Sequence, residues 1–318
     1  MSRGKRVLIR LAWFVASLLL ASLLIFAATN LLPGDIANVL LGTNASAEQV
    51  EALREQLGLN RPFPVRYVEW LSGVVVGDFG TSMVGGQPVS SIIFSRLEIS
   101  AWLVGLATIG SLVIALPVGT YAAMRRRHVD GVAVSAASQV GLAVPSFWAG
   151  IWLVVLFAVT LRWLPAGGYV SYWDSFTDWV RHLILPVAAL SIVQASVISR
   201  YVRSAVIDVL HTDYFRTARA IGWTRSGAIW RHGMRNISIS LLTVIGLQIT
   251  TLLVGAIIIE QVFAIPGLGS RLLLAVTQRD LAIVQGIVLV LVWAVLLINF
   301  LVDVAYQFVD PRLRQEAT

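Results

Sequence analysis

The chain has 318 residues, of which 57% are hydrophobic and 13% are charged. Soluble domains carry roughly 25% charged residues, so the composition excludes an ordinary soluble domain and indicates a chain surrounded mostly by lipid. Cysteine is absent, which excludes disulfides, thiolate metal sites and thiol nucleophiles. The formal net charge of +7 would suit a nucleic-acid partner, but the distribution of the arginines argues for membrane orientation instead and against nucleic acid.

Six stretches of the chain lack Asp, Glu, Lys and Arg. They are residues 11–34, 99–124, 131–161, 182–199, 236–259 and 281–302. Each reaches or approaches the roughly 20 apolar residues that a helix needs to cross the hydrocarbon of a bilayer. None shows the polar face that helices of a soluble bundle present at helical spacing. The sequence therefore predicts an all-α membrane protein with six transmembrane helices.

The uncharged stretches and the loops between them predict the order of the parts. The first 24-residue run is longer than the apolar region of a signal peptide, so we expect it to remain as the first span. The predicted parts are a cytoplasmic N-terminus (1–10), the first span (11–34), an extracytoplasmic subdomain (35–97), a membrane domain with the other five spans (98–307) that includes a long loop at about 206–236, and a cytoplasmic tail (308–318).

Basic residues predict the orientation. If the N-terminus is cytoplasmic and six spans alternate, 16 of the 24 basic residues fall on the cytoplasmic side. Cytoplasmic loops carry such an excess of Lys and Arg. We therefore expect a multi-pass protein of the bacterial plasma (inner) membrane with both termini in the cytoplasm.

Two helices are predicted in the extracytoplasmic subdomain. The first covers Ala47–Leu57 and follows Ser46, a residue suited to cap a helix N-terminus. The second lies near Val65–Val76, after two prolines.

Enzymatic chemistry is poorly supported. Lys5 is the single lysine, and the glycines of a phosphate-binding P-loop do not surround it. The four histidines are scattered and share no metal-ligand spacing. We therefore expect no catalytic residue, no metal site and no cofactor in this chain, so any ATPase that drives it is a separate chain.

The loop at about 206–236 carries the most specific pattern. It reads Arg-Thr-Ala-Arg-Ala-Ile-Gly over Arg216–Gly222, followed by Arg-His-Gly-Met-Arg-Asn over Arg231–Asn236. This string resembles the Glu-Ala-Ala loop of ABC-importer permeases in its peptide-family form. In that family the loop forms a short coupling helix that sits in a groove of the ATPase. The resemblance therefore implies ATPase-coupling roles for Arg216, Thr217, Ala218, Arg219, Ala220 and Gly222.

Small side chains suit this coupling role. Thr217, Ala218 and Ala220 would let a helix approach a groove closely, and Gly222 can end the helix with a positive φ.

Further motifs extend the resemblance over nearly the whole chain, in order. They are Leu32–Asp35, Leu53–Leu59, Gly77–Ser82, Val144–Trp148, Trp163–Gly168, Glu260–Gly269 and Asp310–Arg312. The chain resembles the first permease subunit of a dipeptide-type importer in the dipeptide, oligopeptide and nickel family. One departure is Ser240, where the family commonly has proline, so we expect a weaker kink there.

The resemblance implies a type I ABC-importer permease fold and an importer of several chains. A second homologous permease would complete a heterodimer, two ABC ATPases would hold ATP and Mg²⁺, and an extracytoplasmic substrate-binding protein would deliver the cargo. Di- and oligopeptides are the expected cargo, because no His or Met cluster marks a metal path. Nickel, haem or glutathione in the same architecture, or a stand-alone secondary transporter, are the alternatives.

Polar side chains inside the spans are the candidates for the translocation pathway, because they are costly in lipid and face the bundle interior. The glutamines lead, since an amide is harder to hide than a hydroxyl, which commonly serves helix packing. The leading candidates are Gln139, Gln194, Gln248 and Gln285; the weaker ones are Ser135, Ser138, Ser191, Ser196, Thr250 and Thr251.

An outer gate or contact with the binding protein is predicted around the Pro-Gly-Leu-Gly turn that follows the fifth span. The residues are Glu260, Pro266, Gly267 and Gly269. The alternative for Glu260 is a structural ion pair with an arginine such as Arg271 or Arg279.

Overall fold

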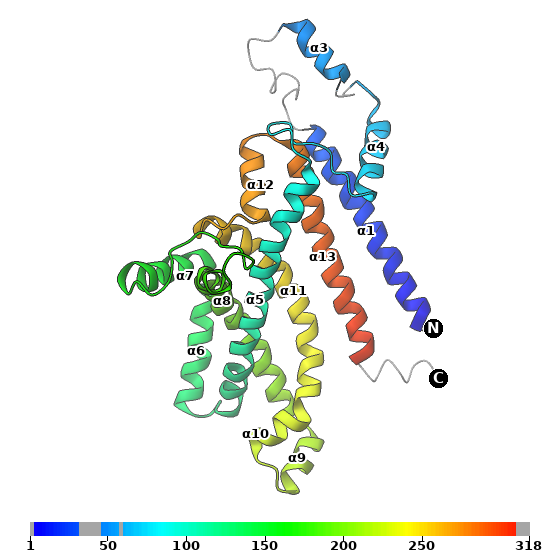
Figure 1. Ribbon diagram of the computed structural model, residues 1–318. Coiled ribbons are helices and arrows are strands. Elements are labelled where there is room, and N and C mark those ends of the chain that lie inside the picture. The colour runs from blue at the N-terminus through cyan, green and yellow to red at the C-terminus, as the bar shows by residue number, and fades with distance from the viewer. Residues whose placement is uncertain (1–2, 32–45, 57–59, 310–318) are drawn as a thin grey trace. The chain divides into compact units, whose positions relative to one another are not determined.

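The computed structural model describes residues 3–31, 46–56 and 60–309, and the regular elements in these ranges are helices. Figure 1 shows their arrangement. The elements are α1 (Arg3–Leu31), α3 (Ala47–Gln56), α4 (Phe63–Val75), α5 (Val89–Met124), α6 (Val129–Ala143), α7 (Ser146–Leu153) with the π-helical segment Val154–Thr160, α8 (Phe176–Leu210), α9 (Asp213–Ala220), α10 (Arg225–Ala228) with the π-helical segment Ile229–Gly233, α11 (Met234–Val262), α12 (Leu268–Thr277) and α13 (Leu281–Val309).

Five helices in the described ranges are long and apolar enough to cross a membrane. They cover residues 7–30, 89–124, 176–210, 240–262 and 281–306. Helix α6 and helix α7, with the π-helical segment that continues α7, are bent by 102° relative to each other at a short break. If this bent pair is counted as one span, it is the sixth. The uncharged stretch 131–161, predicted as one span, is thus divided into two helical pieces.

The break in the third stretch has a local cause. Val144 adopts an extended backbone, with φ −86° and ψ 118°, as the residue before a proline prefers. Pro145 then stands immediately before the first residue of α7, where its missing N–H costs no helical hydrogen bond. One dipeptide thus ends α6 and begins α7.

Helix α11 is continuous through Ser240. The Ser240 hydroxyl lies 3.5 Å from the Asn236 carbonyl oxygen one turn earlier. A serine keeps the backbone N–H that a proline lacks, so the weaker kink expected at this position agrees with the uninterrupted helix.

The chain divides into two compact units. Unit 1 comprises residues 1–8, 99–270 and 297–318, and unit 2 comprises residues 9–98 and 271–296. In unit 1, α8 packs against α6, α7 and α11.

Two apolar clusters form the core of unit 1. One contains Leu103, Leu190 and Ile259, and the other contains Val202 and Ile237. Each draws on α5, α8 and α11, so these three helices connect the two clusters.

Helix α4 packs on α1 through aromatic rings in unit 2. Phe26 of α1 lies with its ring centroid 5.3 to 5.6 Å from those of Phe63, Tyr67 and Trp70 of α4. The Tyr67 hydroxyl is also 2.8 Å from the hydroxyl of Ser22, which is buried in α1. These contacts explain why the predicted second helix of the loop forms.

The predicted first helix of the loop is confirmed over its described residues. The backbone N–H of Gln49 donates to the Ser46 hydroxyl at 3.3 Å, and the Ser46 N–H donates to the Gln49 side chain at 3.0 Å. This reciprocal pair is a capping box. The predicted last residue, Leu57, lies outside the described residues.

Candidate functional site

Helix α9 contains the string that resembles a coupling helix. It begins after Thr212, which has an extended backbone with φ −78° and ψ 151°. Phe215 and Ala218 are three residues apart, so they share one face of the helix, and both are buried. They belong to the apolar cluster that includes Val209 and Ile229. Helix α9 is therefore fixed to the rest of unit 1 by one narrow apolar face.

The C-terminal end of α9 is defined by a glycine. Gly222 has φ +97°, and its N–H donates to the Arg219 carbonyl at 3.2 Å. The next N–H, of Trp223, donates to the Ala218 carbonyl at 3.2 Å. These two bonds form a Schellman motif, so the conformation predicted for Gly222 is confirmed.

The predicted coupling residues divide between two faces of α9. Arg216, Thr217, Arg219, Ala220 and Gly222 are exposed, together with Ile221, which is 70% exposed. Ala218 is only 5% exposed. Its small side chain therefore serves packing within this chain, and the expectation that Ala218 meets a partner's groove is wrong.

Polar contacts around α9 hold its exposed face in place. The Arg219 guanidinium donates to the Trp223 carbonyl at 2.5 Å, and the Asn236 amide of α11 donates to the Tyr214 hydroxyl at 2.9 Å. Arg216 pairs with Asp213 at 3.2 Å, but both side chains are exposed, and such pairs contribute little stability. The Arg216 charge thus remains available on the surface.

Exposed Ile221 was missed by the analysis of the sequence. The signal that could have found it is an apolar residue directly before the glycine of the motif.

The predicted outer-gate residues gather around the carboxylate of Glu260, which is 1% exposed. This carboxylate accepts from the Ser100 hydroxyl at 2.5 Å and from the Ser270 N–H at 2.9 Å. The Gly269 N–H donates to it as well. Hydroxyl and amide donors thus take the place of the arginine partner that was the alternative for Glu260, and the carboxylate caps the first turn of α12.

Both glycines of the turn are places of close approach. A Cβ on Gly267 would lie 2.2 Å from a carboxylate oxygen of Glu260, and a Cβ on Gly269 would lie 2.6 Å from the Ile257 Cα. Pro266 is half-buried in the same turn. Only glycine lets the turn close over the carboxylate.

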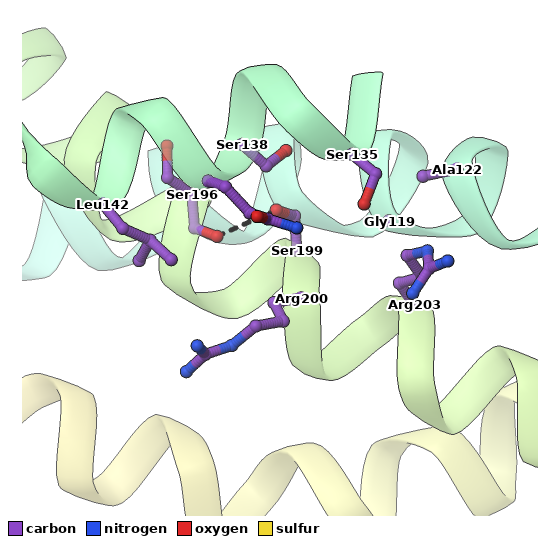
Figure 2. Close-up of a pocket in the computed structure, with 10 residues that line it drawn as sticks. Gly119, Ala122, Ser135, Ser138, Leu142, Ser196, Ser199, Arg200 and Arg203 are labelled. Carbon is purple, nitrogen blue, oxygen red and sulfur yellow. Dashed lines mark hydrogen bonds between the residues drawn. The ribbon is translucent and has the colours of Figure 1, made fainter. Parts of the chain in front are cut away.

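The four candidate pathway glutamines lie in three different places. In unit 1 the Gln194 amide donates to the Gln248 side chain at 2.8 Å, and Gln194 is buried. In unit 2 the Gln285 amide donates to the Thr29 hydroxyl at 2.5 Å. Gln139 is exposed and lines a separate cavity of unit 1, which Figure 2 shows.

That cavity has a volume of about 150 Å³ and lies where α5, α6 and α8 meet. Its lining residues are mostly small or polar: Gly119, Ala122, Ser135, Ser138, Gln139, Leu142, Ser196, Ser199, Arg200 and Arg203. In the sequence, Arg200 and Arg203 count among the basic residues that predict the orientation, and no local pattern places them beside the serines.

The fold matches that of a solved importer. The structure of the MetNI methionine ABC transporter in an inward-facing conformation contains a chain that matches with a TM-score of 0.58 at 18% identity, over 69% of this chain and 96% of that chain. At this identity the match concerns the fold, which is that of a type I ABC-importer permease.

The chain belongs to the family of binding-protein-dependent transport system inner membrane components. The model of that family matches residues 115–315, and the model of its N-terminal region matches residues 5–103. A peptide transport system permease protein of Brucella abortus is 39% identical over 98% of this chain and 99% of its own length. The glutathione transport system permease protein GsiC of Salmonella typhi is 39% identical over 97% and 98%, respectively.

The family and the fold define this chain as a multi-pass permease subunit of an ABC importer. The sequence-based assignment to the peptide-type permeases is therefore confirmed. Permease subunits of this class are not catalytic.

Proposed function

We propose that this chain forms, with a second homologous permease, the membrane pathway of an ATP-driven importer for short peptides. The observation that carries the proposal is α9, a short helix with one buried apolar face and a Schellman end at Gly222, which presents Arg216, Thr217 and Ala220 to a partner. The partner is an ABC ATPase, two copies of which bind Mg²⁺ and ATP. Closure of the ATPases around ATP moves α9, and the spans switch between two packings.

The orientation follows from the arginine distribution. With both termini in the cytoplasm, α9 and the arginines around it face the ATPases, since cytoplasmic loops are rich in Lys and Arg. The turn at Pro266–Gly269 then faces the opposite side, where an extracytoplasmic binding protein delivers the cargo.

The cargo is inferred from the names of the relatives. Proteins named as peptide permeases and as glutathione permeases match this chain equally well, at 39% identity. Glutathione is itself a tripeptide, so both names describe short peptides. Short peptides in general are the proposed cargo, and glutathione is the second candidate.

Reconstitution tests this proposal. The chain is assembled in proteoliposomes with the second permease, the ATPases and the binding protein of the proposed importer, and uptake of labelled dipeptide, glutathione and Ni²⁺ is compared with and without ATP. We expect ATP-dependent uptake of dipeptide or glutathione and no uptake of Ni²⁺. Solute transport by this chain without any ATPase would overturn the coupling role, and selective uptake of Ni²⁺ would overturn the cargo.

A further inference from the structure

The cavity between α5, α6 and α8 collects polar residues that the sequence offers only as scattered candidates. Ser135, Ser138 and Gln139 come from α6, and Ser196 comes from α8. Two arginines of α8 complete the lining (Figure 2). Arg203 is half-buried among these helices whereas Arg200 is exposed, so the position of the Arg203 charge is the one that requires a reason.

Neither arginine has an acidic partner in the part of the chain that the structure describes, where no salt bridge joins Arg200 or Arg203 to an acid. The Nε atom of Arg203 is buried and finds no hydrogen-bond acceptor among these residues. Figure 2 shows the Arg203 side chain extending from α8 toward the part of α5 that carries Gly119 and Ala122. A buried guanidinium donor without an acceptor is a place where an anion would be stabilised.

The other lining groups divide into occupied and free hydrogen-bonding groups. The hydroxyls of Ser138, Ser196 and Ser199 donate to carbonyl groups of their own helices. The side chain of Gln139 has no hydrogen-bond partner within the described residues. The donors left for a ligand are therefore the Gln139 amide, the Ser135 hydroxyl and the guanidinium groups, and no carboxylate lines the cavity.

Close backbone packing fixes the walls of the cavity. A Cβ on Gly119 would lie 2.5 Å from the Ser199 carbonyl oxygen, so α5 touches α8 directly. A Cβ on Gly141 would lie 2.2 Å from the Ser196 hydroxyl, so α6 also touches α8. The three helices are therefore in contact on both sides of the space that the serines and arginines surround.

We propose that this cavity binds the C-terminal carboxylate of a peptide in transit, with Arg203 as the main ligand and Gln139 as a second donor. The inference rests on the proposed function, since it assumes that peptides pass this chain. Peptides differ in their side chains but share a terminal carboxylate, and guanidinium groups bind carboxylates through paired hydrogen bonds. A cavity of about 150 Å³ takes one end of a peptide and leaves its side chains outside.

The absence of cysteine from the chain allows a direct binding test. Ser138→Cys places a single thiol in the cavity wall of the assembled transporter, purified in neutral phosphatidylcholine nanodiscs with cysteine-free partner chains. The labelling rate with a small maleimide is measured alone, with millimolar Ala-Ala, and with Ala-Ala amide. We expect Ala-Ala to slow labelling at least threefold and the amide to leave the rate unchanged.

Arg203→Gln in the Ser138→Cys background identifies the ligand group, and we expect it to abolish protection by Ala-Ala. Arg127→Gln is the matched control, because it removes the same charge from an exposed position outside the cavity, and protection should remain. A thiol at exposed Ser238 reports any general effect of the peptide on labelling.

Equal protection by both peptide forms, or none by either, would overturn the proposal, as would a thiol that never reacts with or without ATP. Protection by anionic phospholipid in place of the peptide would reassign the cavity to a lipid headgroup. These results are independent of the uptake assay, so a transporter that imports peptides without protecting the thiol contradicts this inference alone.

Discussion

The carboxylate of Glu260 accepts a hydrogen bond from the Ser100 hydroxyl at 2.5 Å, although the two residues are 160 positions apart in the chain. The Ser100 oxygen in turn accepts the Leu268 N–H at 2.8 Å. Ser100 therefore connects α5, α11 and the first turn of α12. A buried carboxylate is tolerated here because several donors surround it.

Replacing Ser100 by alanine should destabilise unit 1. The change removes a donor from Glu260 and an acceptor from the Leu268 N–H, both of them buried. Leaving buried groups unsatisfied costs about 1–3 kcal/mol. The measurement is the midpoint of thermal unfolding of the purified chain in detergent. Ser95→Ala is the control, since that exposed hydroxyl bonds only the Ile92 carbonyl of its own helix; equal midpoints for both variants would contradict the network.

Gly267→Ala should be more damaging than an ordinary glycine substitution. The new Cβ would lie 2.2 Å from a Glu260 oxygen, which the surrounding donors hold in place. We expect strongly reduced accumulation of folded chain, measured by fluorescence-detected size exclusion. Gly105→Ala is the matched control, because nothing lies within 4 Å of its new Cβ and alanine favours the helix by about 1 kcal/mol. Wild-type accumulation of Gly267→Ala would show that the turn can relax.

Ala220→Trp and Ala218→Trp should fail in different ways. Ala220 is exposed on α9, so a bulky side chain should block docking and reduce ATP-driven uptake at least tenfold while the chain still inserts and unfolds normally. Ala218 is buried, so the same substitution should lower the unfolding midpoint, because overpacking costs about 1–3 kcal/mol. Uptake and thermal unfolding measured on both variants separate the effects. Normal uptake by Ala220→Trp would contradict the docking face.

The sequence determines the membrane class and the position of the coupling string. Uncharged stretches are a strong signal, because lipid excludes charge over the whole length of a span. The positive φ of Gly222 also followed from local chemistry, since a glycine after a short helix permits the left-handed cap. The capping box at Ser46 likewise involves only Ser46 and Gln49, three positions apart, so a local pattern encodes it.

What the sequence could not provide depends on distant neighbours. Pro145 is visible in the sequence, but proline occurs in both straight and broken spans: α5 continues through Pro117, whereas the third stretch bends by 102° at Pro145. The inward direction of Ala218 is set by the cluster around Val209. The donors around the Glu260 carboxylate come from Ser100, Gly269 and Ser270, which are 9 to 160 positions away. No local pattern encodes such contacts.

Gln194 and Gln248 should be coupled in stability. Their amide groups bond to each other at 2.8 Å between α8 and α11. Hydrogen bonds between helices in membranes contribute about 0.6 kcal/mol on average, with a maximum of about 1.7. A double-mutant cycle with leucine at each position, read from thermal unfolding, should give a coupling energy in this range. Additive single changes would indicate that the two amides act independently.

The loss of uptake caused by a substitution at Gly222 should depend on how well the new residue tolerates a positive φ, and not on the size of its side chain. No atom lies within 4 Å of a Cβ built there, so strain comes only from φ +97°. Asparagine tolerates the left-handed region, so Gly222→Asn should retain most uptake. Gly222→Ala should destabilise the left-handed conformation at the C-terminal end of α9 by about 1 kcal/mol.

Gly222→Pro should abolish ATP-driven uptake while the chain still inserts in the membrane. Proline fixes φ near −65° and removes the N–H that donates to the Arg219 carbonyl, so the Schellman end cannot form. Co-purification of the ATPase with the permease, measured beside uptake, should rank the residues as glycine, asparagine, alanine and proline. A proline variant that binds the ATPase and imports normally would show that α9 transmits no force through this end.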